Sequence, residues 1–220
     1  TKICAPEKLH GLIKTSGLDS EPLGPEAAQT VKHGRWVSLM SLPQRLGVNP
    51  TNPIINGEYI QTTDQLCHKW EKIIHPNGRR WPVIGIHWQG NPNAEKTYLK
   101  NRSIPLEKFS KIAVNNPNFK FLSLQKGPGS EQLTECSFLD RFTERQELID
   151  STWDFLESAA IISNCDLVIT NDTACAHLAG GMGMETWLLL AKIPEWRWGL
   201  SGDSSFWYPS MRLFRQTTNG

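Results

Sequence analysis

Polar side chains that could bind a phosphate group follow the short apolar run at residues 167–169. The run, Leu-Val-Ile, is typical of a buried parallel strand, and we expect a helix to open after it on Thr173, with Asp172 as its N-cap. Thr173 and His177 are four positions apart, so they share one face of that helix. A helix N-terminus at the carboxyl end of a parallel strand attracts anions. The free amides, the hydroxyl and the imidazole therefore predict a phosphate or diphosphate site.

Two further loops carry groups suited to an anionic ligand. The loop after the expected strand at residues 82–88 contains Gly90, which permits close backbone approach, and the cations Lys100 and Arg102. An arginine can bind phosphate through two parallel hydrogen bonds. The next strand is followed by Lys126 among glycines, a weaker signal because the Walker pattern is missing. Since successive parallel strands end at one edge of a sheet, the three loops are predicted to gather there.

Strand patterns alternate with helix patterns after residue 82. We expect strands at residues 82–88, 119–124, 167–171, 186–190 and 211–215, and helices at residues 105–114, 151–164 and 173–181. The second of these helices is expected to begin at Ser151 or Thr152, and the charged residues 131–150 are ambiguous, with a short strand and a loop as one interpretation. Strands separated by helices indicate βαβ units with right-handed crossovers. The predicted fold class is α/β, a Rossmann-like parallel sheet with helices on both faces.

The first 75 residues look different, because Pro, Gly and Ser interrupt short elements. We expect strands at residues 2–5 and 35–40, helices at residues 7–14 and 64–74, and an irregular segment at residues 44–61. Two strands are fewer than a stable open sheet usually has. We therefore place a boundary at the turn that contains Gly78. Residues 1–78 are predicted to be the C-terminal part of an α/β domain whose start is absent, and residues 79–220 to be a second domain.

Composition excludes several classes of function. The net charge is +1, from 23 basic and 22 acidic residues, which gives no electrostatic reason to expect a nucleic-acid partner. No apolar run approaches the roughly 20 residues that span a bilayer, so no membrane span is expected. The five cysteines form no CxxC pair, which disfavours a zinc site and a disulfide framework. A reducing cytoplasm is the expected location.

Two common kinds of enzyme site are also disfavoured. No GxGxxG motif follows a strand, which argues against a nicotinamide site, and no GxSxG elbow indicates a serine hydrolase. His87, at the end of an expected strand, could face the predicted cleft. Trp196 and Trp198 stand in an expected loop, where they would either pack or stack on a sugar or base.

Five separated motifs, in order, resemble a group of bacterial glycosyltransferase-like domains. They occupy residues 83–92, 101–106, 121–127, 166–181, and 196–198 together with 207–216. The group is related to heptosyltransferases and, more distantly, to O-linked GlcNAc transferase, and its members often follow tetratricopeptide repeats. The resemblance is strong over residues 82–216 and only general before residue 75.

The resemblance implies a GT-B architecture, in which an acceptor-side domain and a donor-binding domain, both Rossmann-like, face each other across a cleft. The second domain would bind a nucleoside-diphosphate sugar of the UDP or ADP type, with no metal and no other cofactor. The residues implied to meet the diphosphate are Asp172, Thr173, Ala174, His177, and Lys100 or Arg102. Those implied to line the base and ribose are Gln125, Lys126 and Gly127. The cleft loop would include His87, Gln89, Gly90, Asn91 and Trp198.

The chain departs from this group at both ends. It begins inside the first domain, and it stops at Gly220, where the group continues into a closing helix. The catalytic base of the group generally comes from the missing part, and nothing singles out Glu7, His33 or Asp64 for that role. The leading hypothesis is sugar transfer to an unknown protein or glycan acceptor. Two alternatives stay open: a non-catalytic nucleotide-sugar binding module on a repeat scaffold, and a sugar-nucleotide epimerase of the same architecture.

Overall fold

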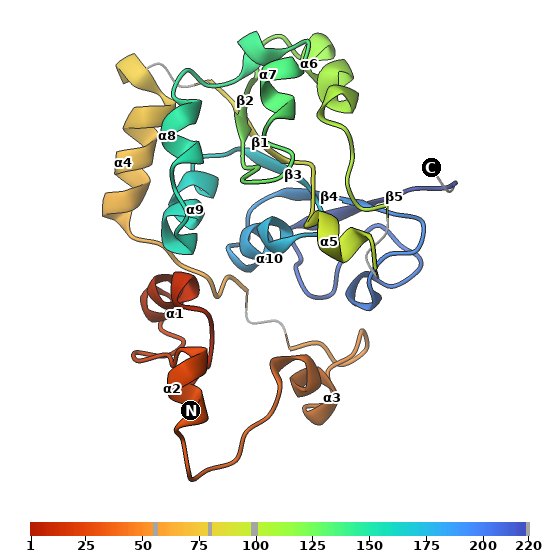
Figure 1. The fold of residues 1–220 in the computed structure, drawn as a ribbon. Helices are drawn as coiled ribbons and strands as arrows, with labels where there is room; N and C mark the ends of the chain where they lie inside the picture. Colours follow the sequence, from red (N-terminus) through yellow and green to blue (C-terminus); the bar gives the residue numbers. More distant parts are fainter. Residues whose placement is uncertain (55–56, 79–80, 98–100, 219–220) are drawn as a thin grey trace.

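A sheet of five parallel strands occupies the second part of the chain (Figure 1). The computed structural model describes residues 1–54, 57–78, 81–97 and 101–218. The strands are β1 (Val83–His87), β2 (Lys120–Ser123), β3 (Leu167–Asn171), β4 (Thr186–Leu190) and β5 (Met211–Arg215). All five were predicted from their apolar runs, three of them with the same bounds. The prediction of a parallel α/β sheet is confirmed.

The order of the strands creates a crevice at one edge of the sheet. Across the sheet the order is β2-β1-β3-β4-β5, so the chain moves away from β1 in one direction and then returns to its other side. Loops that leave two such strands in opposite directions open a binding crevice at the carboxyl edge. In the register of β1 and β3, His87 lies beside Thr170. The crevice is therefore expected between the ends of these two strands.

Short helices cover both faces of the sheet. They are α5 (Pro92–Glu95), η4 (Leu106–Phe109), α6 (Ser110–Asn115), α7 (Gln132–Glu135), η5 (Leu139–Arg141), α8 (Gln146–Asp150), α9 (Phe155–Ile162), α10 (Ala174–Gly181) and η6 (Trp196–Trp198). The predicted start of the helix at Ser151 or Thr152 is wrong, because Asp154 is the N-cap of α9. The strand considered within residues 131–150 is also absent, since Phe142 makes only a single bridge to Phe121.

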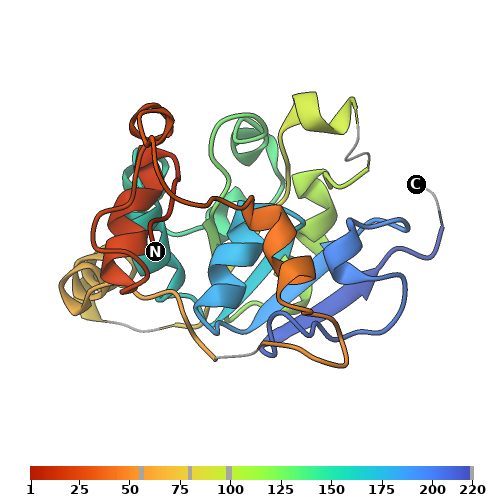
Figure 2. The same ribbon diagram turned by 90° about the horizontal axis from the view of Figure 1, so that it is seen from below.

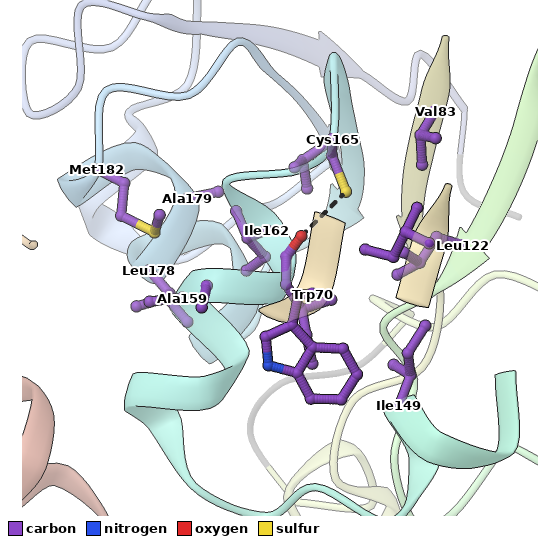
Figure 3. Packing of buried hydrophobic residues seen from close by; sticks show 14 of the residues in the cluster. Trp70, Val83, Leu122, Ile149, Ala159, Ile162, Cys165, Leu178, Ala179 and Met182 are labelled. Atoms are coloured by element: carbon purple, nitrogen blue, oxygen red, sulfur yellow. Dashed lines mark hydrogen bonds between the residues drawn. The ribbon is translucent and has the colours of Figure 1, made fainter. Parts of the chain in front are cut away.

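One face of the sheet packs against α4 (Asp64–Ile74), α9 and α10. Trp70 of α4 points into the same buried cluster as Val83 and Leu122 of the sheet and Ile162 of α9 (Figure 3). Trp70 also donates its indole N–H to Glu157 on α9, which receives Lys69 as an ion pair at 2.7 Å. This cluster joins the first part of the chain to the sheet.

The other face carries an aromatic cluster beneath η4, α6 and α7. Phe121 of β2 meets Phe138 edge to face, with ring centroids 5.6 Å apart, and Phe142 packs beside both. Trp88, fully buried directly after β1, belongs to the same cluster and donates its indole N–H to the Gly129 carbonyl at 3.1 Å. Such aromatic pairs stabilise a core beyond their buried area. This face fixes the loops that leave β1 and β2.

The first part of the chain is helical where it is regular. Its elements are η1 (Glu7–Leu9), α1 (His10–Thr15), α2 (Pro25–Gln29), η2 (Leu39–Ser41), α3 (Leu42–Arg45), α4 and η3 (Pro76–Gly78). The strands predicted at residues 2–5 and 35–40 are wrong. Cys4 makes one isolated bridge to Leu23, and residues 35–38 are exposed and irregular. A strand needs a neighbour for its backbone groups, and no strand lies within the described residues before Val83 to supply one.

The helix predicted at residues 64–74 is confirmed with its predicted bounds. Thr63 caps it, because its hydroxyl oxygen accepts from the Leu66 amide at 3.2 Å. The helix packs on α9, a helix of the second part (Figure 1). The division of the chain at residues 78 and 79 stays a prediction.

The carboxyl edge of the sheet faces the helices of the first part. In Figure 1, α5 and α10, which follow β1 and β3, lie below the sheet, and α1, α2 and α3 lie below them. Figure 2, seen from below, shows these first helices in front of the same edge. No helix in the described part of the chain has both the length and the apolar character needed to cross a membrane.

Candidate functional site

The helix α10 begins at the end of β3 without a cap from its own sequence. Its N-cap is Thr173, in an extended conformation (φ −145°, ψ 178°), and no side chain among the described residues accepts from the first turn. The prediction that Asp172 caps this helix is wrong. The extended residue Thr173 separates Asp172 from the first turn, and the Asp172 carboxylate lies near the Trp198 indole instead.

The first amides of α10 are open. Among the described residues, no acceptor binds the backbone N–H of Ala174 or Cys175, whereas the N–H of Ala176 reaches the Thr173 carbonyl at 3.1 Å. Ala174 itself is exposed. Free amides and the helix dipole give this end a partial positive charge. The start of α10 is therefore suited to an anion, and the predicted diphosphate site there stays a prediction.

Arg102 lies beside this helix start. Its Nη1 donates to the Asp172 carbonyl at 3.0 Å, and its Nε lies 3.5 Å from the Glu95 carboxylate. The guanidinium rests on Gly90, where an added Cβ would lie only 2.2 Å from Nε. Only glycine leaves this space, so the sequence motif around Gly90 has a steric reason. Lys100, the other predicted cation, lies outside the described residues.

Asn171 joins the two loops that flank the site. It is fully buried at the end of β3, and its Nδ2 donates to the carbonyls of Trp88 at 3.1 Å and Arg102 at 2.9 Å. No role was predicted for this residue from the sequence. A polar residue directly after a buried apolar run was the available signal, because such a side chain must find hydrogen-bond partners inside the protein.

Gln125 fixes the loop after β2. It is 2% exposed, and its Oε1 accepts from the amides of Trp88 and Gln89, while its Nε2 donates to the carbonyls of Gln89 and Pro128. These four bonds hold the loops after β1 and β2 together. The predicted contact of Gln125 with a base or ribose stays a prediction.

Two other predicted cleft-loop residues also make local bonds. The Gln89 side-chain oxygen accepts from Gln132 at 3.0 Å. Asn91 caps α5 by accepting from the Asn93 amide at 2.9 Å. Both residues lie in the loop that leaves β1, so the structure brings them to the edge of the sheet where the sequence placed them.

A cavity of about 190 Å³ opens next to the start of α10. Its apolar wall comes largely from α9, α10 and the loop after β2, and its polar lining includes His87, Lys126 and Lys8. Burial lowers the pKa of the Lys126 ammonium, which donates to the Thr152 carbonyl. Gly127, with φ +70°, follows it in the left-handed region that favours glycine. The cavity thus gathers groups from the ends of β1, β2 and β3.

His87 is neutral in this setting. Burial, together with the nearby Arg102 charge, lowers its pKa to about 4, although a hydrogen bond with Asn171 acts in the opposite direction. Its Nδ1 lies 3.0 Å from the Asn171 side-chain oxygen and 3.4 Å from the Thr173 hydroxyl. His87 therefore lies at the same edge of the sheet as Thr173, and its place in a ligand cleft stays a prediction.

His177 lies one turn into α10, and two aromatic side chains fix its ring. Its Nδ1 lies 2.9 Å from the Tyr208 hydroxyl, and its ring stacks on buried Trp198 with centroids 5.3 Å apart. Burial lowers its pKa to about 4, so the imidazole is neutral. Trp198 is only 3% exposed and therefore packs against the helix. Whether His177 meets a diphosphate stays a prediction.

Burial raises the pKa of the Asp172 carboxyl above its usual value. The Trp198 indole and the charges of Arg102 and Arg197 act against this shift. Within the described ranges, no three His, Cys, Asp or Glu side chains form a group that could hold a metal ion.

Comparisons with known proteins bear on the fold. No protein-family model and no curated protein matches the chain. Among solved structures, the glycosyl transferase family 9 protein from Veillonella parvula DSM 2008 matches with a TM-score of 0.51 and 16% identity, over 80% of this chain and 47% of that chain. E. coli ADP-heptose LPS heptosyltransferase II matches with a TM-score of 0.54 and 16% identity, over 76% and 47%.

The fold is that of a Rossmann-like GT-B domain. The chain spans about half the length of these two structures. At this level of identity the similarity concerns the fold, and the function must be argued from the site.

Proposed function

We propose that this chain binds a nucleoside-diphosphate sugar, of the UDP or ADP type, at the start of α10 and serves in transfer of the sugar. One observation carries the proposal. The uncapped amides of Ala174 and Cys175 lie at the switch point of a parallel sheet, beside Arg102 and next to a cavity. This is the position where α/β proteins bind nucleotides, and an uncapped helix end is a general anion site. The resemblance of the sequence motifs to heptosyltransferase-like domains supports the same choice.

The proposed chemistry is electrostatic. Breaking a bond between a sugar and a phosphate leaves extra negative charge on the diphosphate. Fixed amides and a guanidinium that are already oriented stabilise this charge where it develops. The Arg102 guanidinium is held by the Asp172 carbonyl and by Glu95, so little reorganisation is needed when the diphosphate arrives.

Two of the residues predicted to bind the base and ribose come directly after the loop begins at the end of β2. Lys126 and Gly127 follow β2 beside the cavity, where the base and ribose are proposed to bind. The acceptor, metal independence, a cytoplasmic location and attachment to tetratricopeptide repeats stay predictions from the sequence.

Binding of nucleoside diphosphates is the first test. Isothermal titration calorimetry with UDP, ADP and GDP is expected to find one of them bound by the wild-type chain. Arg102→Gln is expected to weaken that binding roughly ten- to a hundredfold, because a charge-assisted hydrogen bond to phosphate is lost. Arg145→Gln, at an exposed position before α8, serves as the matched control. Equal affinities in the wild type and Arg102→Gln would contradict the proposal.

A binding module without catalysis is the second candidate, which the sequence leaves open. Turnover of nucleotide sugars distinguishes the transferase from the binding module. Release of nucleoside diphosphate from a panel of donor sugars indicates a transferase, and binding without release indicates a module. Conversion of the donor sugar with no acceptor present indicates an epimerase.

A further inference from the structure

The orientation of the Asn171 side chain is fixed by its partners. Its amide nitrogen lies within hydrogen-bond distance of the Trp88 and Arg102 carbonyls, and a carbonyl can only accept. The two N–H groups of the amide are therefore used there. The side-chain oxygen is left to face His87 as an acceptor, 3.0 Å from Nδ1.

This arrangement fixes the tautomer of His87. An acceptor facing Nδ1 requires that Nδ1 carries the proton. The Thr173 hydroxyl fits the same assignment. It donates to the backbone carbonyl of Asn171 at 3.5 Å, so its oxygen can accept from Nδ1 of His87 at 3.4 Å. The imidazole is neutral, so Nε2 carries a lone pair and no proton.

The free lone pair belongs to a ring that lines the cavity. His87 lines the cavity beside Ala174 and Cys175, and Nε2 makes no hydrogen bond with any described residue. Burial and the nearby Arg102 charge favour the neutral ring. Most of the other lining side chains are apolar. The cavity thus contains, at His87 Nε2, an acceptor that can receive a hydrogen bond from a ligand.

We propose that His87 is a specificity-determining residue that accepts, at unprotonated Nε2, a hydrogen bond from a hydroxyl group of the bound ligand. The inference rests on the proposed function, since the diphosphate at the start of α10 brings two hydroxyl-bearing groups near the cavity. One is the ribose of the nucleotide, and the other is the transferred sugar. Both offer the same O–H donor, so the experiment must distinguish them.

The tautomer can be tested without a variant that disturbs the fold. Two-bond ¹⁵N–¹H correlation spectra of the whole chain report which imidazole nitrogen is protonated. His10 gives an internal reference of opposite form, because its Nε2 donates to the Ala5 carbonyl at 2.9 Å. We expect unprotonated Nε2 at His87 and protonated Nε2 at His10. A protonated Nε2 at His87 would overturn the inference.

Calorimetry then tests the ligand hydroxyl. His87→Phe is expected to lose affinity roughly tenfold, as expected for one hydrogen bond, while His68→Phe on an exposed position of α4 is unchanged. If the ribose is the donor, the loss appears with the nucleoside diphosphate alone, and 2′- or 3′-deoxy nucleotides bind the wild type and His87→Phe equally. If the transferred sugar is the donor, the loss appears only with the nucleotide sugar.

Failure of the His87 inference can be distinguished from failure of the proposed function. If the wild type binds the ribo- and deoxynucleotides equally and binds the nucleotide sugar as tightly as its deoxysugar analogues, this inference is overturned while the proposed function stands. If the wild type binds no nucleoside diphosphate or nucleotide sugar, both are overturned. The deoxy analogues need only wild-type protein, so the test holds even where His87→Phe does not fold.

Discussion

The helices α9 and α10 are the same length and pack in the same core, yet their N-termini are built in opposite ways. Each has eight residues, and the first residues of both line the same cavity. The start of α9 is closed, because the Asp154 carboxylate accepts from the amides of Leu156 at 2.5 Å and Glu157 at 3.3 Å. The start of α10 has no such acceptor within the described part of the chain.

The difference shows which backbone amides of this chain are available to a ligand. A capped helix start satisfies its own amides and contributes to folding, typically by about 1 kcal/mol. An uncapped start at a switch point leaves its amides to an external anion. The surroundings of α10 also differ from those of α9. Gly90 leaves space for the Arg102 guanidinium, and two neutral histidines, His177 on α10 and His87 beside it, lie close by. Four predictions test this contrast, from the largest expected effect to the smallest.

Acidification should destabilise the protein through the two buried histidines near α10. Folded His87 and His177 have pKa values near 4, whereas unfolded histidines titrate near 6.5. Between these values the unfolded chain binds more protons, so the free energy of unfolding should fall as the pH is lowered from 6.5 to 4. The loss is about 3 kcal/mol for each histidine. Urea denaturation at stepped pH measures it.

The matched variant for this prediction replaces both histidines with phenylalanine. Its stability should change much less over the same pH range. The raised pKa of Asp172 acts in the opposite direction in both proteins, so their difference isolates the histidines. Equal pH dependence in the two proteins would contradict the neutral imidazoles.

The far end of α10 should be intolerant of a methyl group. An added Cβ at Gly180 would lie 2.6 Å from the Tyr208 ring, the partner of His177. Gly180→Ala is expected to lower the free energy of unfolding by about 2 kcal/mol, because the ring must shift. In Gly11→Ala of α1 the nearest atom, on Leu156, is at an ordinary 3.6 Å. Thermal unfolding measures both variants, and Gly11→Ala should be neutral or slightly stabilising.

Closing the open helix should convert α10 into a helix like α9. Thr173→Asp places a carboxylate at the N-cap and is expected to keep or slightly raise stability. The affinity for the nucleoside diphosphate should fall roughly tenfold or more, because the new charge occupies the anion site. Thr173→Asn, which caps without a charge, should lose less. Undiminished affinity in Thr173→Asp, measured by calorimetry, would refute the anion site at this helix.

Opening the closed helix should have the smallest effect. Asp154→Ala is expected to cost about 1 kcal/mol of stability, because two amides of α9 lose their acceptor. Asp154→Asn should retain most of the cap. Chemical denaturation measures the cost, and nucleotide affinity should stay at the wild-type value. A large loss of affinity in Asp154→Ala would mean that α9 also contributes to the site.

Local patterns were enough for the elements that bury one continuous apolar segment. The runs that became β3, β4 and β5 were predicted with their observed bounds, and so was α4. The segment at residues 35–40 has an equally apolar pattern but forms no strand. Its backbone has no neighbouring strand in the part of the chain that the structure describes, and the presence of such a neighbour cannot be read from local sequence.

The sequence by itself determined that a polar turn and a helix follow a buried strand, and that Arg102, Lys126 and His177 belong to the same sheet edge. Only the tertiary structure decided that Thr173, not Asp172, is the N-cap of α10, that Arg102 rests on Gly90, and that Asn171 orients His87. The physical reason is the range of the interactions. Apolar periodicity acts between near neighbours in the chain, whereas these contacts join residues as far as 84 positions apart.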